Sequence, residues 1–148
     1  MKYQKAFLAK FPDQIEFALN NYDRHNLSID QFSHVVIGGL GGSGIAGRIA
    51  KSYFHGTSPV PIEIVSDYNL PAYVGEKSLV ILSSYSGNTE ETLSLYISAI
   101  EKHATVLVIT TGGLLQELAL EANIQIFEAE KGFQPRMALG YSLTFLVL

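Results

Sequence analysis

The sequence predicts an α/β protein: a three-layer αβα sandwich around a parallel sheet of about five strands. Three short apolar runs rich in β-branched residues show no polar alternation, which is typical of strands buried on both faces (34–38, 78–83 and 105–110). Segments with helical periodicity lie between these runs, and strands alternating with helices favour right-handed crossovers. We expect an N-terminal helical segment over 1–30 and an α/β core over 34–148.

The other elements follow from weaker patterns. Two apolar runs, 61–65 and 123–127, fit the edges of the sheet. Apolar residues at helical spacing predict the buried face of three helices. These residues are Phe11, Ile15, Ala18, Leu19 and Tyr22 in the first helix, Leu93, Tyr96, Ile97 and Ile100 in the second, and Leu114, Leu115, Leu118 and Ala119 in the third.

The last eleven residues, 138–148, are apolar with a helical pattern. They end without the glycine, asparagine or basic residue that commonly marks the C-terminus of a helix. Such a helix exposes apolar surface unless a partner subunit or further chain covers it. We favour a single domain that forms the first half of a longer chain. The exposed surface also predicts self-association, with a homodimer as the expected form.

Composition excludes several classes of protein. The chain has 148 residues, 47% of them hydrophobic, which suits one folded domain and excludes intrinsic disorder. The absence of cysteine excludes a disulfide scaffold, thiolate zinc sites and a cysteine nucleophile. A net charge of -4 disfavours nucleic acid and anionic membranes as partners. No apolar run approaches the roughly 20 residues of a membrane span, and the N-terminus does not resemble a signal peptide, so we expect a cytoplasmic protein.

The glycine loop, residues 38–44, follows the first predicted strand and opens a helix. Glycine allows close backbone approach, and a helix N-terminus offers free N–H groups, so the loop suits an anion. Gly39, Gly41 and Gly44 satisfy G-x-G-x-x-G, and Asp67 ends the next strand, so an NAD-binding Rossmann site stays open. Ile45 excludes a Walker A loop and a nucleophile elbow. A tight turn without a ligand is the simpler alternative.

The hydroxyl loop, residues 83–92, is the most specific feature of the sequence. Side-chain hydroxyls at 84, 86 and 89 surround Gly87 where a strand ends and a helix begins. Hydroxyls and backbone amides at a helix N-terminus suit a phosphate dianion without a lysine. The alternative is an ordinary N-cap by Ser86 or Asn88, with Glu90 and Glu91 complementing the helix dipole. Ligands of open α/β sheets bind beyond the carboxyl ends of strands, where both loops lie.

The two loops together resemble the sugar isomerase (SIS) domain, a flavodoxin-like fold. The resemblance rests on Gly41-Gly42-Ser43-Gly44 and on Ser84-Tyr85-Ser86-Gly87-Asn88-Thr89-Glu90-Glu91-Thr92. A third segment makes the chain similar to the bifunctional phosphoglucose/phosphomannose isomerases. This segment is Gln134-Pro135-Arg136-Met137-Ala138-Leu139-Gly140-Tyr141. The likeness covers the first half of that family's chain, which has two SIS domains.

This resemblance implies an enzyme that interconverts glucose 6-phosphate or mannose 6-phosphate with fructose 6-phosphate. It implies phosphate contacts from Ser43, Ser84, Ser86 and Thr89, close backbone approach at Gly42 and Gly87, and a catalytic role for Arg136. The arginine would stabilise negative charge on the enediolate oxygens. In that family the glutamate, histidine and lysine that move protons come from the second half. We therefore expect this chain to carry the phosphate site without the base and to be inactive alone.

Two other functions remain open from the residues alone. A stand-alone SIS module that senses a sugar phosphate needs the hydroxyl loop but no base. An NAD-binding Rossmann domain rests on the glycine loop and Asp67 and leaves the hydroxyl loop unexplained. We predict no cofactor and no metal, because no His or acid cluster has ligand spacing. The four histidines are expected to be structural residues at the ends of elements (His25, His34, His55 and His103).

Overall fold

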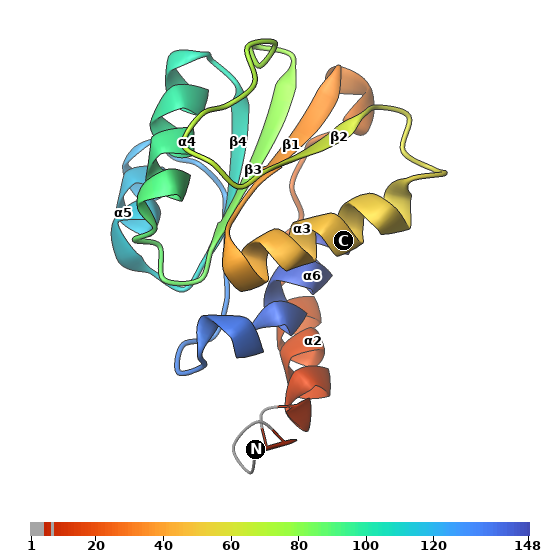
Figure 1. Cartoon of the computed structure of the whole chain (residues 1–148), viewed down its shortest axis with the longest axis vertical. Coiled ribbons are helices and arrows are strands. Elements are labelled where there is room, and N and C mark those ends of the chain that lie inside the picture. The colour runs from red at the N-terminus through yellow and green to blue at the C-terminus, as the bar shows by residue number, and fades with distance from the viewer. Residues whose placement is uncertain (1–4, 7) are drawn as a thin grey trace.

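A five-stranded parallel sheet with the strand order β2-β1-β3-β4-β5 forms the centre of the protein (Figure 1). This computed structural model describes residues 5–6 and 8–148. The strands are β1 (His34–Gly38), β2 (Ile62–Val65), β3 (Ser78–Ser84), β4 (Thr105–Thr110) and β5 (Ile126–Glu128). The predicted α/β class and parallel sheet are confirmed, and the two weaker apolar runs are the edge strands β2 and β5.

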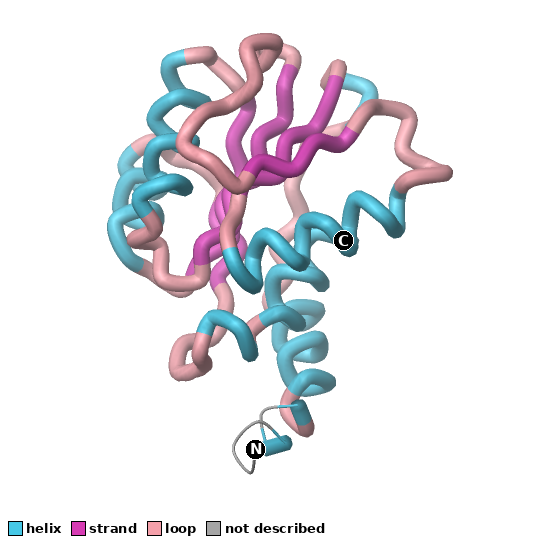
Figure 2. The backbone as a smooth tube through the Cα atoms, viewed as in Figure 1, coloured by secondary structure: helices cyan, strands magenta, loops and turns pink. Residues whose placement is uncertain are grey.

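The helices cover both faces of the sheet. They are α2 (Phe11–Asn20), α3 (Gly41–Phe54), α4 (Glu90–Glu101), α5 (Gly113–Glu121) and α6 (Leu139–Val147), with the short 3-10 helices η1 (Ile29–Gln31) and η2 (Pro135–Met137). α4 and α5 lie on one face, and α2, α3 and α6 lie on the other (Figures 1 and 2). The chain moves from β1 to β2 in one direction and from β3 to β5 in the other, so right-handed crossovers place α3 opposite α4 and α5.

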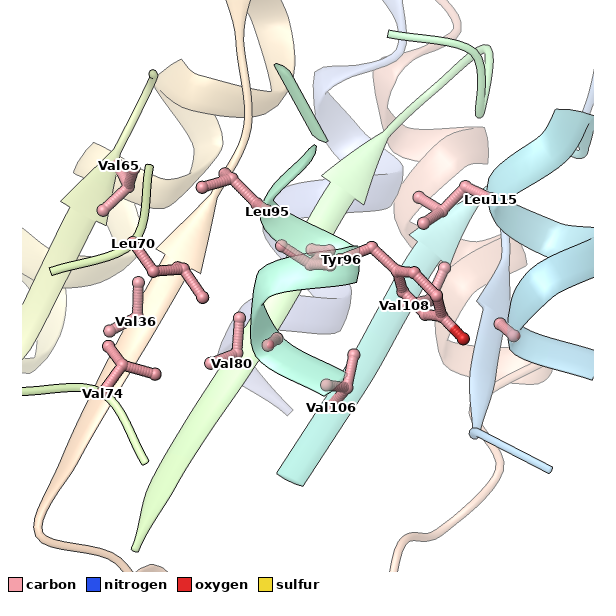
Figure 3. Packing of buried hydrophobic residues seen from close by; sticks show 13 residues of the cluster. Val36, Val65, Leu70, Val74, Val80, Leu95, Tyr96, Val106, Val108 and Leu115 are labelled. Atoms are coloured by element: carbon pink, nitrogen blue, oxygen red, sulfur yellow. The ribbon is translucent and has the colours of Figure 1, made fainter. Parts of the chain in front are cut away.

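Each face of the sheet has its own apolar core. Val36, Val80 and Val108 point toward α4 and α5, where they pack with Leu95 and Leu115 (Figure 3). The opposite face of the same strands packs against α2 and α6 through Val35, Ile37, Leu79, Leu107, Ala18, Tyr141 and Phe145. Because alternate residues of a strand face opposite sides, burial on both faces explains why the strand runs lack polar alternation.

β3 extends further than β1 at the carboxyl edge of the sheet. Gly38, the last residue of β1, pairs with Leu82, whereas Ser83 and Ser84 pair only with β4. These two serines therefore extend beyond the last residue of β1 that pairs with β3. This step in the sheet edge lies between the ends of the two strands that precede the glycine loop and the hydroxyl loop.

The predicted helix faces are partly wrong. In α4 the buried side chains include Leu95 and Ala99, while Ile97 is 54% exposed and Ile100 is 41% exposed. In α2 the predicted Leu19 is 52% exposed. In α5, Leu115 and Ala119 are buried as predicted, but Leu114 is exposed. Apolar side chains lie on more than one side of these helices, so the spacing alone did not identify the side that contacts the sheet.

The C-terminal segment forms the predicted helix, with most of its apolar surface covered. Tyr141 is 1% exposed and Phe145 is 6% exposed, and the Phe145 ring lies 5.4 Å from that of Phe127. The exposed apolar side chains of this segment are limited to Val147 and Leu148. Of the helices in the described ranges, none combines the length and the apolar character that crossing a membrane requires.

Candidate functional site

The carboxyl ends of β1 and β3 mark the point where the strand order reverses. β1 connects toward β2 on one side, and β3 connects toward β4 on the other. Doubly wound sheets bind ligands in the crevice outside this switch point. The helices α3 and α4 both begin there, within the two segments that the sequence singled out. The fold thus brings the glycine loop and the hydroxyl loop to one place.

The glycine loop is shorter than its glycine run suggests, because α3 already begins at Gly41. Gly39 and Leu40 alone connect β1 to α3. The Gly39 amide donates to the Val65 carbonyl over 3.1 Å, and the Ser66 hydroxyl donates to the Gly39 carbonyl over 2.8 Å. A Cβ at Gly39 would lie 2.9 Å from the Ser83 carbonyl oxygen. Glycine here allows the ends of β1 and β3 to approach each other.

The segment that carries Arg136 lies against the first turn of α3. A Cβ at Gly42 would be 2.7 Å from the Pro135 carbonyl oxygen and 3.5 Å from the Arg136 Cα atom. Gly41, Gly42, Ile45, Arg136 and Leu139 line a hollow of about 210 Å³. The structure therefore brings Arg136 next to Gly42, although 94 positions of sequence separate them. The close approach at Gly42 is made by the protein's own backbone.

The hydroxyl loop is organised by its own side chains. The Ser84 and Thr89 hydroxyls share a hydrogen bond of 2.9 Å, and the Gly87 amide donates to the Ser84 hydroxyl oxygen over 3.2 Å. The Asn88 amide donates to the Ser86 hydroxyl oxygen over 3.2 Å. Ser84 is buried, Thr89 is half-buried and Ser86 is exposed. The three hydroxyls predicted to act together lie in one hydrogen-bonded turn at the start of α4.

The segment after β4, residues 111–115, contacts the hydroxyl loop and fixes its position. The sequence did not reveal these contacts. Gly87 has a φ of 70°, and a Cβ there would collide with the Gly112 carbonyl oxygen. The Leu115 amide donates to the Gly87 carbonyl, and the Leu114 amide donates to the Asn88 side chain, both over 2.9 Å. These contacts use the first-turn amides of α5 to fix the position of the loop that opens α4.

The N-termini of α3 and α4 differ from those of α5 and α6. First-turn amides have no partner within a helix, so other groups must satisfy them. In α5 they donate to the hydroxyl loop, and in α6 the Gly140 amide donates to the Gln14 side-chain oxygen over 3.0 Å. Among the described residues, no hydrogen bond from outside the helix reaches the first-turn amides of α3 or α4. Two open helix N-termini therefore meet at the switch point.

Arg136, Glu90 and Glu91 are charged side chains beside the two loops. Within the described ranges, the exposed Arg136 guanidinium takes part in no hydrogen bond or ion pair. Glu90 and Glu91 lie in the first turn of α4, as predicted, and Glu90 accepts a 3.4 Å hydrogen bond from the Tyr68 hydroxyl. The charge of Glu91, then burial and Glu90, raise the pKa of Tyr68. At least the Glu90 carboxylate thus points toward the loop after β2.

Gln14 is a buried residue of this region that the sequence reasoning did not single out. Its side chain is 1% exposed, and its Nε2 donates to the Met137 carbonyl over 2.6 Å. Its Oε1 accepts from the Gly140 amide, so one amide group bridges the end of η2 and the start of α6. The available signal was its position four residues before Ala18, on the buried face of α2.

The histidines do not approach the switch point through any described contact. His34 and Ser78, the first residues of β1 and β3, share a 2.7 Å hydrogen bond at the opposite edge of the sheet. His25 packs edge-on to Phe127. His55 ends α3. Within the described ranges, no group of three or more His, Asp or Glu side chains is arranged to hold a metal ion.

Asp67 does not form the pattern expected of a dinucleotide fold. Its carboxylate accepts a 2.6 Å hydrogen bond from the Tyr68 amide, which makes it part of a local turn. The strand order is β2-β1-β3-β4-β5, whereas the dinucleotide-binding fold has the order 3-2-1-4-5-6. The strand order of this chain is that of flavodoxin-like sheets, as the resemblance to the SIS domain implied. Neither Asp67 nor the strand order therefore supports the dinucleotide interpretation.

Comparison with known proteins identifies relatives of this fold. The family model for the SIS domain matches residues 28–147. A bifunctional phosphoglucose/phosphomannose isomerase from Caldicellulosiruptor bescii is 43% identical over 139 residues, which are 93% of this chain and 41% of that protein. The enzyme of the same name from Aquifex aeolicus is 41% identical, over 88% of this chain and 42% of that protein. The chain thus spans about two fifths of the length of these relatives.

A solved structure supports the fold independently. The Vibrio vulnificus NanR protein complexed with ManNAc-6P superimposes with a TM-score of 0.74 and 18% sequence identity. The superposition covers 99% of this chain and 59% of that one. At this level of identity the likeness establishes the shared architecture of the domain.

Proposed function

Because the chain belongs to the SIS domain family, we propose that it binds a sugar phosphate in the crevice beyond β1 and β3. The observation that carries this proposal is the pair of open helix N-termini at the switch point, beside three clustered hydroxyls. Helix N-termini attract anions through free amides and the positive end of the dipole. A sugar phosphate supplies a dianion for the amides and hydroxyl groups for further contacts.

The proposed phosphate contacts come from both loops. Ser84, Ser86 and Thr89 contribute hydroxyls from the hydroxyl loop, and Ser43 contributes one from α3. The Ser84, Ser86 and Thr89 hydroxyls already organise the loop, and a hydroxyl can donate to a phosphate while it accepts from an amide. Backbone amides near Gly42 and Gly87 complete the proposed site.

The proposed reaction is the aldose–ketose isomerisation of glucose 6-phosphate or mannose 6-phosphate to fructose 6-phosphate. The names of the relatives support this reaction, and they span more sequence than this chain. Arg136 beside the hollow at the start of α3 is suited to stabilise the negative charge of an enediolate. Proton transfer between C1 and C2 needs a base, which we propose comes from the part of the longer relatives that this chain does not match.

A sugar-phosphate sensor without catalysis is the second candidate. It would use the same phosphate contacts but would not require a cation at the reacting end of the sugar. Arg136 is exposed and lies against the first turn of α3, which favours the isomerase. The two candidates therefore differ in what an Arg136 substitution changes: turnover of the longer enzyme in the first case, and little in the second.

A thermal-shift titration with fructose 6-phosphate, inorganic phosphate and NAD tests the binding proposal. A ligand that binds only the folded state adds about 2.7 kcal/mol of stability at a concentration roughly hundredfold above its Kd. We expect a saturable shift with fructose 6-phosphate that Ser86→Ala reduces strongly, and no isomerisation by this chain alone. A shift with NAD alone would overturn the proposal, and turnover by this chain would overturn the assignment of the base to a separate part.

We also propose that residues 1–148 form a single domain and the first of two SIS domains in a longer chain, and that it pairs with a second copy. Exposed apolar side chains support pairing: Ile45, Ile49 and Tyr53 follow one another at four-residue spacing on α3, and Val147 and Leu148 end the chain. Light scattering that shows a clean monomer at high concentration would exclude the homodimer. A phosphorylated metabolite as ligand fits a cytoplasmic location.

A further inference from the structure

Tyr85 connects the hydroxyl loop to the segment that carries Arg136. It stands between Ser84 and Ser86, and its phenol hydroxyl reaches across the edge of the sheet to residues 130–133. The hydroxyl donates to the Glu130 carbonyl over 2.8 Å and accepts from the Phe133 amide over 3.0 Å. One side chain therefore makes two backbone hydrogen bonds to a segment that is more than 40 residues away in sequence.

The base of Tyr85 is fixed on the opposite side. Its carbonyl accepts hydrogen bonds from the Thr111 amide over 3.1 Å and from the Thr111 hydroxyl over 2.7 Å. Its ring packs against the core cluster between the sheet and α6. Burial raises the pKa of the phenol, so the hydroxyl stays protonated and able to donate well above neutral pH. The phenol thus connects the hydroxyl loop directly to residues 130–133.

The contacts continue from the phenol to Arg136. Two residues after Phe133 the chain enters η2, and the Pro135 carbonyl lies against Gly42 at the start of α3. Glu130 is itself held, because the Tyr141 hydroxyl donates to its carboxylate over 2.7 Å. A shift of residues 130–133 would move Arg136 relative to the two helix N-termini.

We propose that Tyr85 is a positioning residue whose hydroxyl holds the segment 130–136 against the hydroxyl loop and so sets the place of Arg136 over the bound sugar. This proposal rests on the proposed function, because it assigns Arg136 to the sugar end of the ligand. It implies that loss of the hydroxyl weakens the recognition of the sugar more than that of the phosphate. The aromatic ring keeps a separate packing role.

The variant Tyr85→Phe removes the hydroxyl and keeps the ring. We would measure by calorimetry the affinities for inorganic phosphate and fructose 6-phosphate in the wild type, Tyr85→Phe, Arg136→Gln and the double variant. Tyr96→Phe is the matched control, because it loses one phenol hydrogen bond, to the Leu118 carbonyl, on the other face of the sheet. Hydrogen exchange of the amides at 133–137 supplies a measurement that needs no ligand.

We expect Tyr85→Phe to bind fructose 6-phosphate about tenfold more weakly and phosphate within about twofold of the wild type. The double variant should bind no more weakly than Arg136→Gln, because both changes act through the same guanidinium. Exchange at 133–137 should accelerate in Tyr85→Phe and not in Tyr96→Phe. Equal losses for both ligands, or additive losses in the double variant, would overturn the proposal and leave Tyr85 a structural residue.

Failure of the proposed function gives a different result. If the wild type binds neither ligand, the binding proposal fails, and the exchange measurement decides the positioning proposal alone. Faster exchange at 133–137 in Tyr85→Phe then supports the connection between the two segments. Unchanged exchange at these amides contradicts it, whatever the affinities are.

Discussion

The glycine loop and the hydroxyl loop open two helices at the same edge of the sheet, but different interactions hold them in place. The hydroxyl loop is held locally, by its own serine and threonine hydroxyls and by the neighbouring segment after β4. The glycine loop has few side chains to use, and backbone of Ser83, Pro135 and Arg136 packs closely against Gly39 and Gly42.

This difference separates local from distant control of the two sides of the site. The hydroxyl loop should respond to substitutions within itself and in residues 110–115. The part of the site at the start of α3 should be sensitive to substitutions of residues that hold η2 in place. Gln14, which lies on α2, is one of these residues. Substitutions on each side of the site test this division.

Gly87→Ala should be the most damaging of these substitutions. Its φ of 70° disfavours a side chain, and the new Cβ would collide with the Gly112 carbonyl oxygen. We expect a loss of about 3 kcal/mol in the free energy of unfolding, from backbone strain and forced displacement of the loop after β4. Urea denaturation measures this loss.

Gly41→Ala is the matched control for that substitution. Gly41 also has a positive φ, 54°, but a Cβ there meets nothing within 4 Å. We expect a loss of about 1 kcal/mol, from the backbone alone. Equal losses for the two variants would show that the collision with Gly112 is relieved cheaply and that the hydroxyl loop is less constrained than its contacts indicate.

Gln14→Leu tests whether a residue of α2 holds η2 in place against the start of α3. The substitution roughly keeps the volume but leaves the Gly140 amide and the Met137 carbonyl without their partner. Because the Gly140 amide is buried and the Met137 carbonyl is partly buried, we expect a loss of about 2 kcal/mol in the free energy of unfolding. The affinity for fructose 6-phosphate should also fall, since η2 carries Arg136.

The control for Gln14 is Gln125→Leu, which loses an exposed hydrogen bond of 2.8 Å from its side chain to the Asp23 carbonyl. We expect an effect below about 1 kcal/mol, because water replaces the lost partner. A Gln14 variant that is as stable as the Gln125 variant would mean that the junction of η2 and α6 is held by apolar packing alone.

Ser84→Ala and Ser43→Ala compare one buried serine from each side. Ser84 is 3% exposed and Ser43 is 8% exposed, yet Ser84 has two hydrogen-bonded neighbours in its loop and the Ser43 side chain has none among the described residues. Ser84→Ala should lower the free energy of unfolding by about 1 kcal/mol, whereas Ser43→Ala should be nearly neutral.

Ligand affinity separates the two serines in a second way. Both variants should bind fructose 6-phosphate about tenfold more weakly if both hydroxyls contact the phosphate. A Ser43→Ala variant with unchanged affinity and stability would remove the α3 side from the phosphate site, and the hydroxyl loop alone would remain. A Ser84→Ala variant of unchanged stability would contradict the local organisation of that loop.

The sequence revealed the local half of this arrangement. Strand runs bounded by turn residues located the sheet, and hydroxyls around Gly87 located the loop whose hydrogen bonds the structure displays. Contacts between distant segments gave no such pattern. No pattern near Gly42 predicts that Pro135 lies against it. No periodicity predicts that the Gln14 side chain forms hydrogen bonds to residues 137 and 140. Tyr85 stood inside the best motif, yet its partners were set by the folded chain.

The helix faces show the same limit in a simpler form. α4 has apolar residues on its exposed side, including Ile97, while Thr92 on its buried side is polar. The helix face predicted from hydrophobicity therefore differs from the face that contacts the sheet. The amide of Gln14 and the hydroxyl of Thr92 are buried because tertiary packing places them there, and hydrophobicity alone cannot anticipate either.

The last comparison concerns the two tyrosines that hold residues 130–133. Burial above all raises the pKa of Tyr141 and of Tyr85 from the usual value of 10.0. A phenol with a raised pKa in the folded state favours folding at low pH. Its contribution is complete below pH 10.0 and is lost as the pH rises through the folded-state pKa. Tyr141→Phe should cost about 1 kcal/mol at neutral pH.

The same substitution should flatten the decline of stability above pH 10.0, because one of the phenols that resists ionisation is gone. Urea denaturation from neutral to alkaline pH, with ultraviolet absorbance of ionised tyrosine, follows both quantities. Tyr85→Phe should flatten the decline less, because the hydrogen bond to the Glu130 carboxylate further raises the pKa of Tyr141, whereas the hydrogen bond from the Phe133 amide lowers that of Tyr85. If Tyr141→Phe left the alkaline decline unchanged, its hydroxyl would ionise as readily in the folded chain as in the unfolded one, and the Glu130 contact would not anchor the Arg136 segment.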